Sequence, residues 1–292
     1  MPRAFRVCVR TLAYPLVICI AFLLFAWLQS FMLGTAAAYI AIIWGLLCIT
    51  VHEWLMPYQQ YWHPTRFDLI NDVAYMVLGQ VLLEQLLLFI AFFLVATLAS
   101  TTEWQISGIW PHDWPIWLQA ILLLVVGDFF RYWLHRLFHQ VPWMWAFHQV
   151  HHSPKRLYWV NVGRFHPIEQ ALQFVVDALP FVLIGVQKEV IYVYFVFYAI
   201  NGFYQHSNCD VRLGPLNWIV AGPELHRWHH SLDLKEANHN YGNNLIVWDV
   251  LFGTRFLPKD HQVGELGIPV ANYPMSYIRQ LVAPFRRYPT TD

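Results

Sequence analysis

Four long apolar runs constrain this chain more than any other feature of its sequence. They lie near residues 11–33, 36–56, 69–99 and 115–134. A helix needs about 20 apolar residues to cross the ~30 Å hydrocarbon core of a bilayer, and each run has that length. Because backbone polar groups find no partner in lipid, a spanning segment must be a helix or part of a closed barrel. The sequence therefore predicts an all-α, multi-span membrane protein.

A fifth apolar stretch, residues 171–205, has a different character. It is interrupted by Pro180, by Gly185 and by the polar residues 187–189. Proline and glycine mark turns, so this stretch predicts a helical hairpin of two shorter halves, which either spans the membrane or dips into it. The predicted fold thus has about four transmembrane helices plus this hairpin.

The distribution of basic residues predicts an orientation in the membrane. Three arginines precede the first apolar run, the loops near 30–35 and 100–114 contain no Lys or Arg, and basic residues recur from Arg131 onward. The positive-inside rule then places the N-terminus and everything after the fourth run on the cytoplasmic side, with Lys188 as the exception. A cleaved signal peptide ending near residues 36–38 is the alternative, but the preceding run exceeds the usual 7–15 residues. We expect a multi-pass protein of a bacterial inner membrane or the endoplasmic reticulum.

The amino-acid composition limits which partners and which kinds of metal site are expected. Only 12% of the residues are charged and 58% are apolar, whereas about a quarter of the residues of a soluble domain are charged. Basic and acidic residues balance at 18 each, so no nucleic acid partner is expected. The four cysteines form no C-x-x-C pair, which argues against iron–sulfur and thiolate zinc sites. Fifteen histidines leave imidazole as the abundant metal ligand.

Histidines gather in three motifs after the fourth run. The sequence has H-x3-H at 135–139 and H-x2-H-H at both 148–152 and 226–230. On a helix, residues three and four apart share a face, so each motif can direct several imidazoles at a metal. One such pair is as typical of an interfacial polar surface as of a metal site, but three motifs on one predicted side indicate metal binding. Eight imidazoles exceed the four ligands of a tetrahedral zinc, which predicts two metal ions. The candidate ligands are His135, His139, His148, His151, His152, His226, His229 and His230.

These motifs, followed by "NYGNNLIVWDVLFGTRF", resemble the fatty acid hydroxylase/sterol desaturase superfamily of membrane di-iron enzymes. The stretches "RFHPIE" and "QHSN" resemble its bacterial sterol-desaturase-like branch. The resemblance divides the chain into a transmembrane helical region (1–124), a di-metal catalytic domain (125–258) and a C-terminal interfacial tail (259–292). The catalytic domain is expected to be a cytosolic, His-rich helical cap.

The resemblance implies a membrane-bound di-iron oxygenase of the monooxygenase type. It would hydroxylate or desaturate a lipid, either sterol-like or a fatty-acyl or ether lipid, with dioxygen as co-substrate and two iron ions that zinc can replace. It also implies that His206 completes a set of nine catalytic metal ligands. Fatty acyl hydroxylases have a further histidine four residues earlier, where this chain has Gly202.

An external electron donor is expected, because the sequence has no haem-attachment motif, no cysteine cluster and no G-x-G-x-x-G fingerprint. A ferredoxin or a b-type cytochrome with its reductase would serve. The alternative function is a non-catalytic membrane haem or metal-binding/transport protein. The histidine motifs lie outside the apolar runs and only Glu84 lies near the middle of one, which argues against this alternative.

Other polar residues near the motifs have several interpretations. His166, before Pro167, is a candidate ligand, ligand partner or helix cap, and His239 is a candidate ligand partner or loop residue. Carboxylates often accept the outward N–H of a ligating imidazole and so fix its orientation. The candidates for this role are Asp128, Glu169, Asp210, Glu224 and Asp249.

Overall fold

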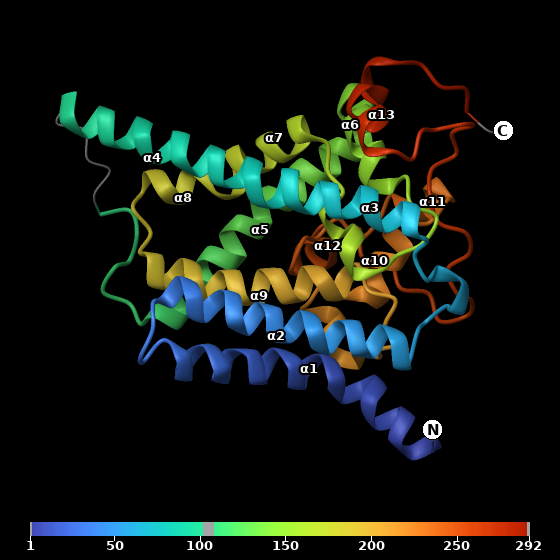
Figure 1. Cartoon of the computed structure of the whole chain (residues 1–292), viewed down its shortest axis with the longest axis horizontal. Coiled ribbons are helices and arrows are strands. Elements are labelled where there is room, and N and C mark those ends of the chain that lie inside the picture. The colour runs from blue at the N-terminus through green and yellow to red at the C-terminus, as the bar shows by residue number, and fades with distance from the viewer. Residues whose placement is uncertain (1, 102–107, 291–292) are drawn as a thin grey trace.

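Long helices lie side by side in the computed structural model, which describes residues 2–101 and 108–290 (Figure 1). Regular structure in these residues is helical, and strand pairing is limited to isolated bridges. Among the described residues, four helical segments are long and apolar enough to cross a membrane. They are Arg3–Leu28, Gly34–Leu55, Arg66–Thr97 and Ile116–Gln140. The predicted all-α, multi-span fold is confirmed.

The first two spans, α1 (Arg3–Leu28) and α2 (Gly34–Leu55), pack along their length. Ala37 and Ala41 on α2 are fully buried beside Ala21 on α1, and such small residues let helix backbones approach closely. The α1 helix begins at Arg3, before the apolar run, so it includes the three arginines.

The third span has an unpredicted feature in its middle. It consists of α3 (Arg66–Ala74), the π-helical segment η2 (Tyr75–Leu83) and α4 (Glu84–Thr101). Within this segment, the carbonyl of Gly79 accepts a hydrogen bond of 2.9 Å from Gln170 Nε2. Short π-helical segments are frequent at functional sites.

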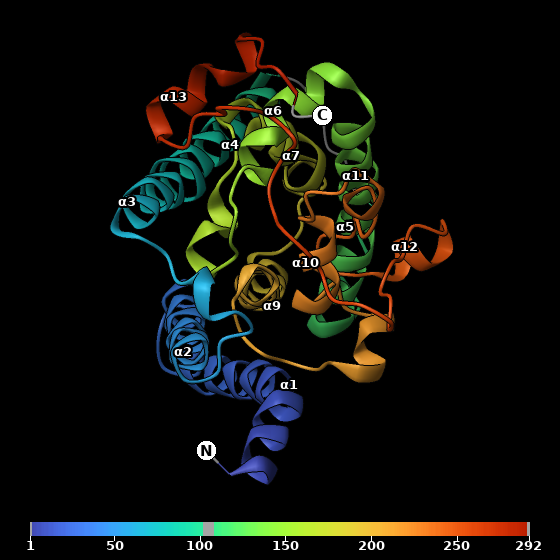
Figure 2. The same cartoon turned by 90° about the vertical axis from the view of Figure 1, so that its right-hand side faces the viewer.

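The predicted hairpin consists of α7 (Pro167–Asp177), α8 (Leu179–Leu183) and α9 (Lys188–His206). The chain turns at Gly185, whose φ of +72° favours glycine. Tyr192 accepts a hydrogen bond of 2.9 Å from Thr35, which begins the second span. The hairpin therefore runs the full length of the bundle. Figure 2 shows α9 end-on, between the α1–α2 pair, the third span and α5 (Ile116–Gln140).

The motif-bearing segments gather at one end of the bundle, together with the beginning of α1 (Figure 1). The loops at 29–33 and 108–115 lie at the other end. Residues 102–107 of the loop predicted at 100–114 lie outside the described residues. The gathered elements are η1 (Gln60–Trp62), α6 (Pro142–His152), η3 (Trp159–Gly163), η4 (Gly214–Trp218), α10 (Pro223–His229), α11 (Leu234–Ala237), α12 (Val247–Leu251), α13 (Tyr277–Val282) and η5 (Ala283–Phe285).

The C-terminal segment folds back over this end of the bundle. Gln280 on α13 is fully buried, accepts a hydrogen bond of 2.9 Å from Tyr75 and donates one of 2.9 Å to Ser153. Ser153 directly follows the histidine motif on α6. The segment is therefore joined to the histidine region as well as to the third span.

Candidate metal centre

All nine histidines predicted as ligands converge, and they form two groups. Within each group, the candidate ligand nitrogens lie within 4.8 Å of one another. The five-histidine group consists of His135, His139, His148, His152 and His229. The four-histidine group consists of His151, His206, His226 and His230.

Each H-x2-H-H motif contributes to both groups. In the motif on α6, the first and last histidines belong to the five-histidine group, and His151 belongs to the other. In the motif around α10 the arrangement is reversed, and only His229 belongs to the five-histidine group. The i and i+4 positions thus face one group, while the i+3 position faces the other.

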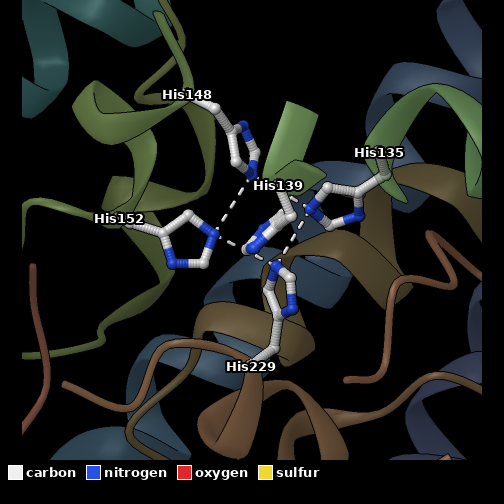
Figure 3. Close-up of side chains that lie close together, drawn as sticks. All are labelled: His135, His139, His148, His152 and His229. Carbon is white, nitrogen blue, oxygen red and sulfur yellow. Dashed lines mark hydrogen bonds between the residues drawn. The ribbon is translucent and has the colours of Figure 1, made fainter. Parts of the chain in front are cut away.

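The five-histidine group has the spacing of a metal site (Figure 3). Its Nε2–Nε2 distances are 3.0 Å from His135 to His148 and 3.1 Å from His148 to His152. They are 3.1 Å from His152 to His229 and 2.9 Å from His229 back to His135. The ring of His139 points toward the middle of this circuit. The corners of a square with such edges lie about 2.1 Å from its centre, which is a typical metal–imidazole distance.

The hydrogen-bond chemistry of this group fits a bound cation. His135 Nδ1 lies 2.7 Å from the carbonyl oxygen of Tyr241, and His229 Nδ1 lies 2.8 Å from that of His239. A carbonyl only accepts, so both Nδ1 atoms carry the proton and both Nε2 atoms carry lone pairs. Burial lowers the pKa of His229 to about 4, which keeps this ring neutral near pH 7. The two lone pairs face each other at 2.9 Å, and a metal ion accepts both. These residues therefore fit a bound metal.

Side chains orient two further ligands of this group. His148 Nδ1 donates to Glu169 Oε1 at 2.6 Å, and His139 Nδ1 lies 3.0 Å from Asn238 Oδ1. Both Glu169 and His148 are buried, and desolvation raises the pKa of Glu169 to about 8. Of the five predicted carboxylates, only Glu169 contacts an imidazole of either group directly.

The four-histidine group is more open. Its short Nε2–Nε2 distances are 2.9 Å from His226 to His206 and 3.1 Å from His226 to His230. These contacts form a chain rather than a closed circuit. Burial lowers the pKa of His206 to about 3 and that of His226 well below its usual value, so these imidazoles too are neutral near pH 7 and able to bind a metal.

Two ligands of the four-histidine group are oriented from η3 and the residue that follows it. His206 Nδ1 lies 2.9 Å from Asn161 Oδ1, and His151 Nδ1 lies 3.2 Å from the carbonyl oxygen of Arg164. The Asn161 amide nitrogen donates to the carbonyl of Arg156, so its oxygen is the atom that faces His206. Sequence analysis missed these partners, and an asparagine beside "RFHPIE" is the only signal for them.

Two predicted carboxylates act through the backbone. Asp249 accepts a hydrogen bond of 2.8 Å from the amide of Tyr241, whose carbonyl receives His135. Asp128 accepts one of 2.8 Å from the amide of Asn244. Together they hold the "NYGNN" segment, residues 240–244, which has irregular backbone that ends in two bends.

The remaining candidates lie outside both groups. Asp210 and Glu224 form ion pairs with arginines, at 3.0 and 3.2 Å. His166 caps α7, where its Nδ1 accepts a backbone hydrogen bond. The ring of His239 stacks on Phe256, so only the carbonyl of this residue contacts a ligand.

A cavity of about 230 Å³ adjoins both groups. Tyr39 on α2 and Val81 on η2 line it and are 44% and 51% exposed, so the cavity reaches the apolar outer surface of the spans. Gly202 also lines it, one helical turn before His206. A Cβ at Gly202 would meet only Val162, at 3.7 Å, so a side chain has room there. Five of the nine ligands line the cavity: His135, His148, His151, His206 and His226.

Comparisons with known proteins agree with this geometry. The family model "Fatty acid hydroxylase" matches residues 120–254. The ornithine lipid hydroxylase OlsE of Rhizobium tropici is 37% identical over 241 residues, which is 82% of this chain and 72% of that protein. The chain belongs to the fatty acid hydroxylase family. It is thus an oxidoreductase of the lipid hydroxylase and monooxygenase type, as predicted, and the non-catalytic alternative is not favoured.

Other relatives match over shorter stretches. Human alkylglycerol monooxygenase is 34% identical over 164 residues, which is 56% of this chain and 36% of that protein. Rat methylsterol monooxygenase 1 is 27% identical over 153 residues, which is 49% of this chain and 51% of that protein. The match thus spans about half or less of these two relatives. No solved structure matches the chain significantly.

Proposed function

We propose that this chain is a di-iron monooxygenase that hydroxylates a membrane lipid with dioxygen and external electrons. One observation carries the proposal: nine neutral imidazoles converge in two groups beside a cavity that reaches the lipid-facing surface. Relatives named as hydroxylases and monooxygenases support hydroxylation over desaturation, and their names point to ornithine lipid, alkylglycerol and methylsterol as classes of substrate to test.

The ligand set suits iron. Imidazole nitrogens bind iron and zinc alike, so zinc can occupy the same groups. Bound iron supplies the reactivity toward dioxygen that side chains lack, and that attack on an unactivated C–H bond requires. The chain would hold both ions in a water-poor environment, since the seven proposed ligands outside α5 are each at most 6% exposed.

The chain's own residues would bind the metal ions, orient the imidazoles and exclude water. Desolvation keeps the imidazoles unprotonated, and the carbonyls of Tyr241 and His239 hold two of them with Nε2 directed inward. Aromatic residues such as Phe165 and Phe203 line the cavity and keep water away from the lipid. The cavity thereby brings a lipid C–H bond to the two groups from the side of the membrane.

The lipid would reach the site from the membrane, whereas the electrons would reach it from the cytoplasm. The histidine groups lie at the end of the bundle where α1 begins with its three arginines, which supports a cytoplasmic location. A ferredoxin, or a b-type cytochrome with its reductase, would deliver electrons from the cytoplasm. The membrane is that of a bacterial cell or of the endoplasmic reticulum.

The test is oxygen-isotope labelling of lipids by the purified, iron-loaded protein. With ferredoxin, its reductase and NADPH, we expect two iron ions per chain and one atom of oxygen-18 from labelled dioxygen in the lipid product. Zinc-loaded protein is the matched control and should give no product. Loss of two hydrogens without gain of oxygen would establish desaturation instead, and no lipid oxidation by the di-iron protein would contradict the proposal.

A further inference from the structure

An aspartate is fully buried in the third span. Asp72 lies on α3, in a segment whose mean hydropathy is 2.2, and its side chain is 0% exposed. An ionisable group in such a segment is costly unless it is paired, and it commonly has a functional role. The partners of Asp72 therefore indicate what this carboxylate does.

The partners of Asp72 stand at the two ends of η3. Tyr158 directly precedes η3, and its hydroxyl donates a hydrogen bond to Asp72 Oδ2. Arg164 directly follows η3, its Nε donates to Asp72 Oδ1 at 2.6 Å, and its Nη2 contacts the same oxygen. Tyr158 and Arg164 are 2% and 1% exposed. One carboxylate thus joins both ends of η3, and we call Asp72, Tyr158 and Arg164 the η3 clamp.

The clamped segment orients half of the four-histidine group. Asn161 lies within η3, and its Oδ1 is 2.9 Å from His206 Nδ1. The carbonyl oxygen of Arg164 is 3.2 Å from His151 Nδ1. The next residue, Phe165, stacks on the ring of His151 with centroids 4.2 Å apart and planes within 8°. A shift of η3 would therefore turn both imidazoles.

The five-histidine group takes its partners from other elements. The carbonyls of Tyr241 and His239, which receive two of its imidazoles, belong to the segment after α11. Glu169, which receives His148, belongs to α7. Because none of these partners lies on η3, loosening the clamp should affect the two groups unequally.

We propose that Asp72 is a positioning residue for the four-histidine group. Its carboxylate holds both ends of η3, and η3 in turn fixes the directions of His151 and His206. Asp72 lies outside residues 120–254, so the proposal adds a residue from beyond the matched region to the site. This inference rests on the proposed function, because it takes these histidines as metal ligands.

Release of zinc to a chelator from the full-length protein in detergent tests the clamp. Removing one partner alone would leave a buried charge unpaired, which is strongly destabilising. Asp72→Asn combined with Arg164→Gln therefore replaces both charges by amides, and we call this double substitution the clamp variant. We expect one ion to leave about tenfold faster and the other to leave as slowly as before. Tenfold is the lower end of the range for partners of metal ligands, because Asp72 acts through η3.

A milder variant keeps the ion pair. Tyr158→Phe removes only the hydroxyl that binds Asp72, so the contact between Asp72 and Arg164 remains. The loss of one hydrogen bond should speed the release of the same single ion roughly 2- to 10-fold. This variant keeps the inference testable where the clamp variant does not fold.

The matched control neutralises a second ion pair between the same two segments. Asp68 lies one helical turn before Asp72 on α3, and it pairs with Arg156 at 3.4 Å. Among the described residues, neither side chain contacts an imidazole of the two groups. Asp68→Asn combined with Arg156→Gln should therefore release both ions as the unmodified chain does.

A second background identifies the ion that leaves quickly. His206→Ala combined with His226→Ala removes two of the four histidines of the four-histidine group, so only the ion of the five-histidine group should remain. Adding the clamp variant to this background should leave the release of that ion unchanged. Faster release of it would overturn the inference.

Unchanged release from the clamp variant would also overturn the inference, and so would equal acceleration of both ions, which a merely structural contact would cause. A fast ion in the matched control would have the same meaning. An unmodified chain that binds no zinc would refute both the clamp and the proposed function. Selective release from the clamp variant, without lipid oxidation by the iron-loaded protein, would refute only the proposed function.

Discussion

The hydrogen bond between Glu169 and His148 provides the sharpest test of the two-group site. Glu169 Oε1 accepts from His148 Nδ1 at 2.6 Å, and the two side chains are 0% and 1% exposed. In Glu169→Leu the imidazole N–H would remain buried without an acceptor, which costs about 1–3 kcal/mol. At about 1.4 kcal/mol per tenfold, the affinity of the five-histidine group for metal should fall roughly 5- to 150-fold. The four-histidine group has no contact with Glu169 and should keep its affinity.

Release of zinc to a chromophoric chelator measures this difference. The unmodified chain should release two ions slowly, whereas Glu169→Leu should release one quickly and one slowly. Glu224→Leu is the matched control, because Glu224 is a largely buried carboxylate beside the motif on α10 that contacts no imidazole. Glu169→Gln retains a carbonyl acceptor and should show a smaller effect. Equal release of both ions from Glu169→Leu, or the same biphasic release from Glu224→Leu, would refute the reasoning.

Three further predictions follow from the same geometry. His151→Ala combined with His229→Ala removes one ligand from each group, so elemental analysis should show loss of most of the metal, and two retained ions would show that the motifs are not the ligands. Gly202→His places an imidazole beside the four-histidine group, so two ions should remain bound while lipid turnover falls on the order of 100-fold, and Gly202→Ala should stay near normal. In a cysteine-free background, an impermeant maleimide should label Asp113→Cys but not Asp233→Cys in intact cells, and equal labelling would contradict the orientation.

The spans and the convergence of the nine histidines were predictable because both leave a pattern in the sequence. An apolar run has to match the bilayer, and imidazoles that share a metal must recur at helical spacing. The π-helical segment left no such pattern, because a continuous apolar run is equally compatible with a regular α-helix. Only the structure shows that Gly79 offers its carbonyl to Gln170 there.

The partners of the ligands were mostly hidden from sequence analysis. We expected carboxylates, but the carbonyls of Tyr241, His239 and Arg164 receive three of the imidazoles. Every residue has a carbonyl, so nothing in the sequence distinguishes those that face a ligand. The carboxylate of Asp249 contacts no imidazole but accepts a hydrogen bond from the amide of Tyr241, the residue whose carbonyl receives His135.

The division of ligands explains why two copies of one motif occur in the chain. A single H-x2-H-H segment directs its first and last imidazoles to one histidine group and its middle imidazole to the other. The copy containing His151 and the copy containing His229 do this in opposite senses, so each group has two histidines from one copy and one from the other. The rise between i and i+3 on a helix, about 4.5 Å, then fixes how the two sites are offset. The remaining ligands come from α5 for one group and from α9 for the other. Two short helical segments thus set the geometry of both sites at once, and a change in either segment should affect both metals.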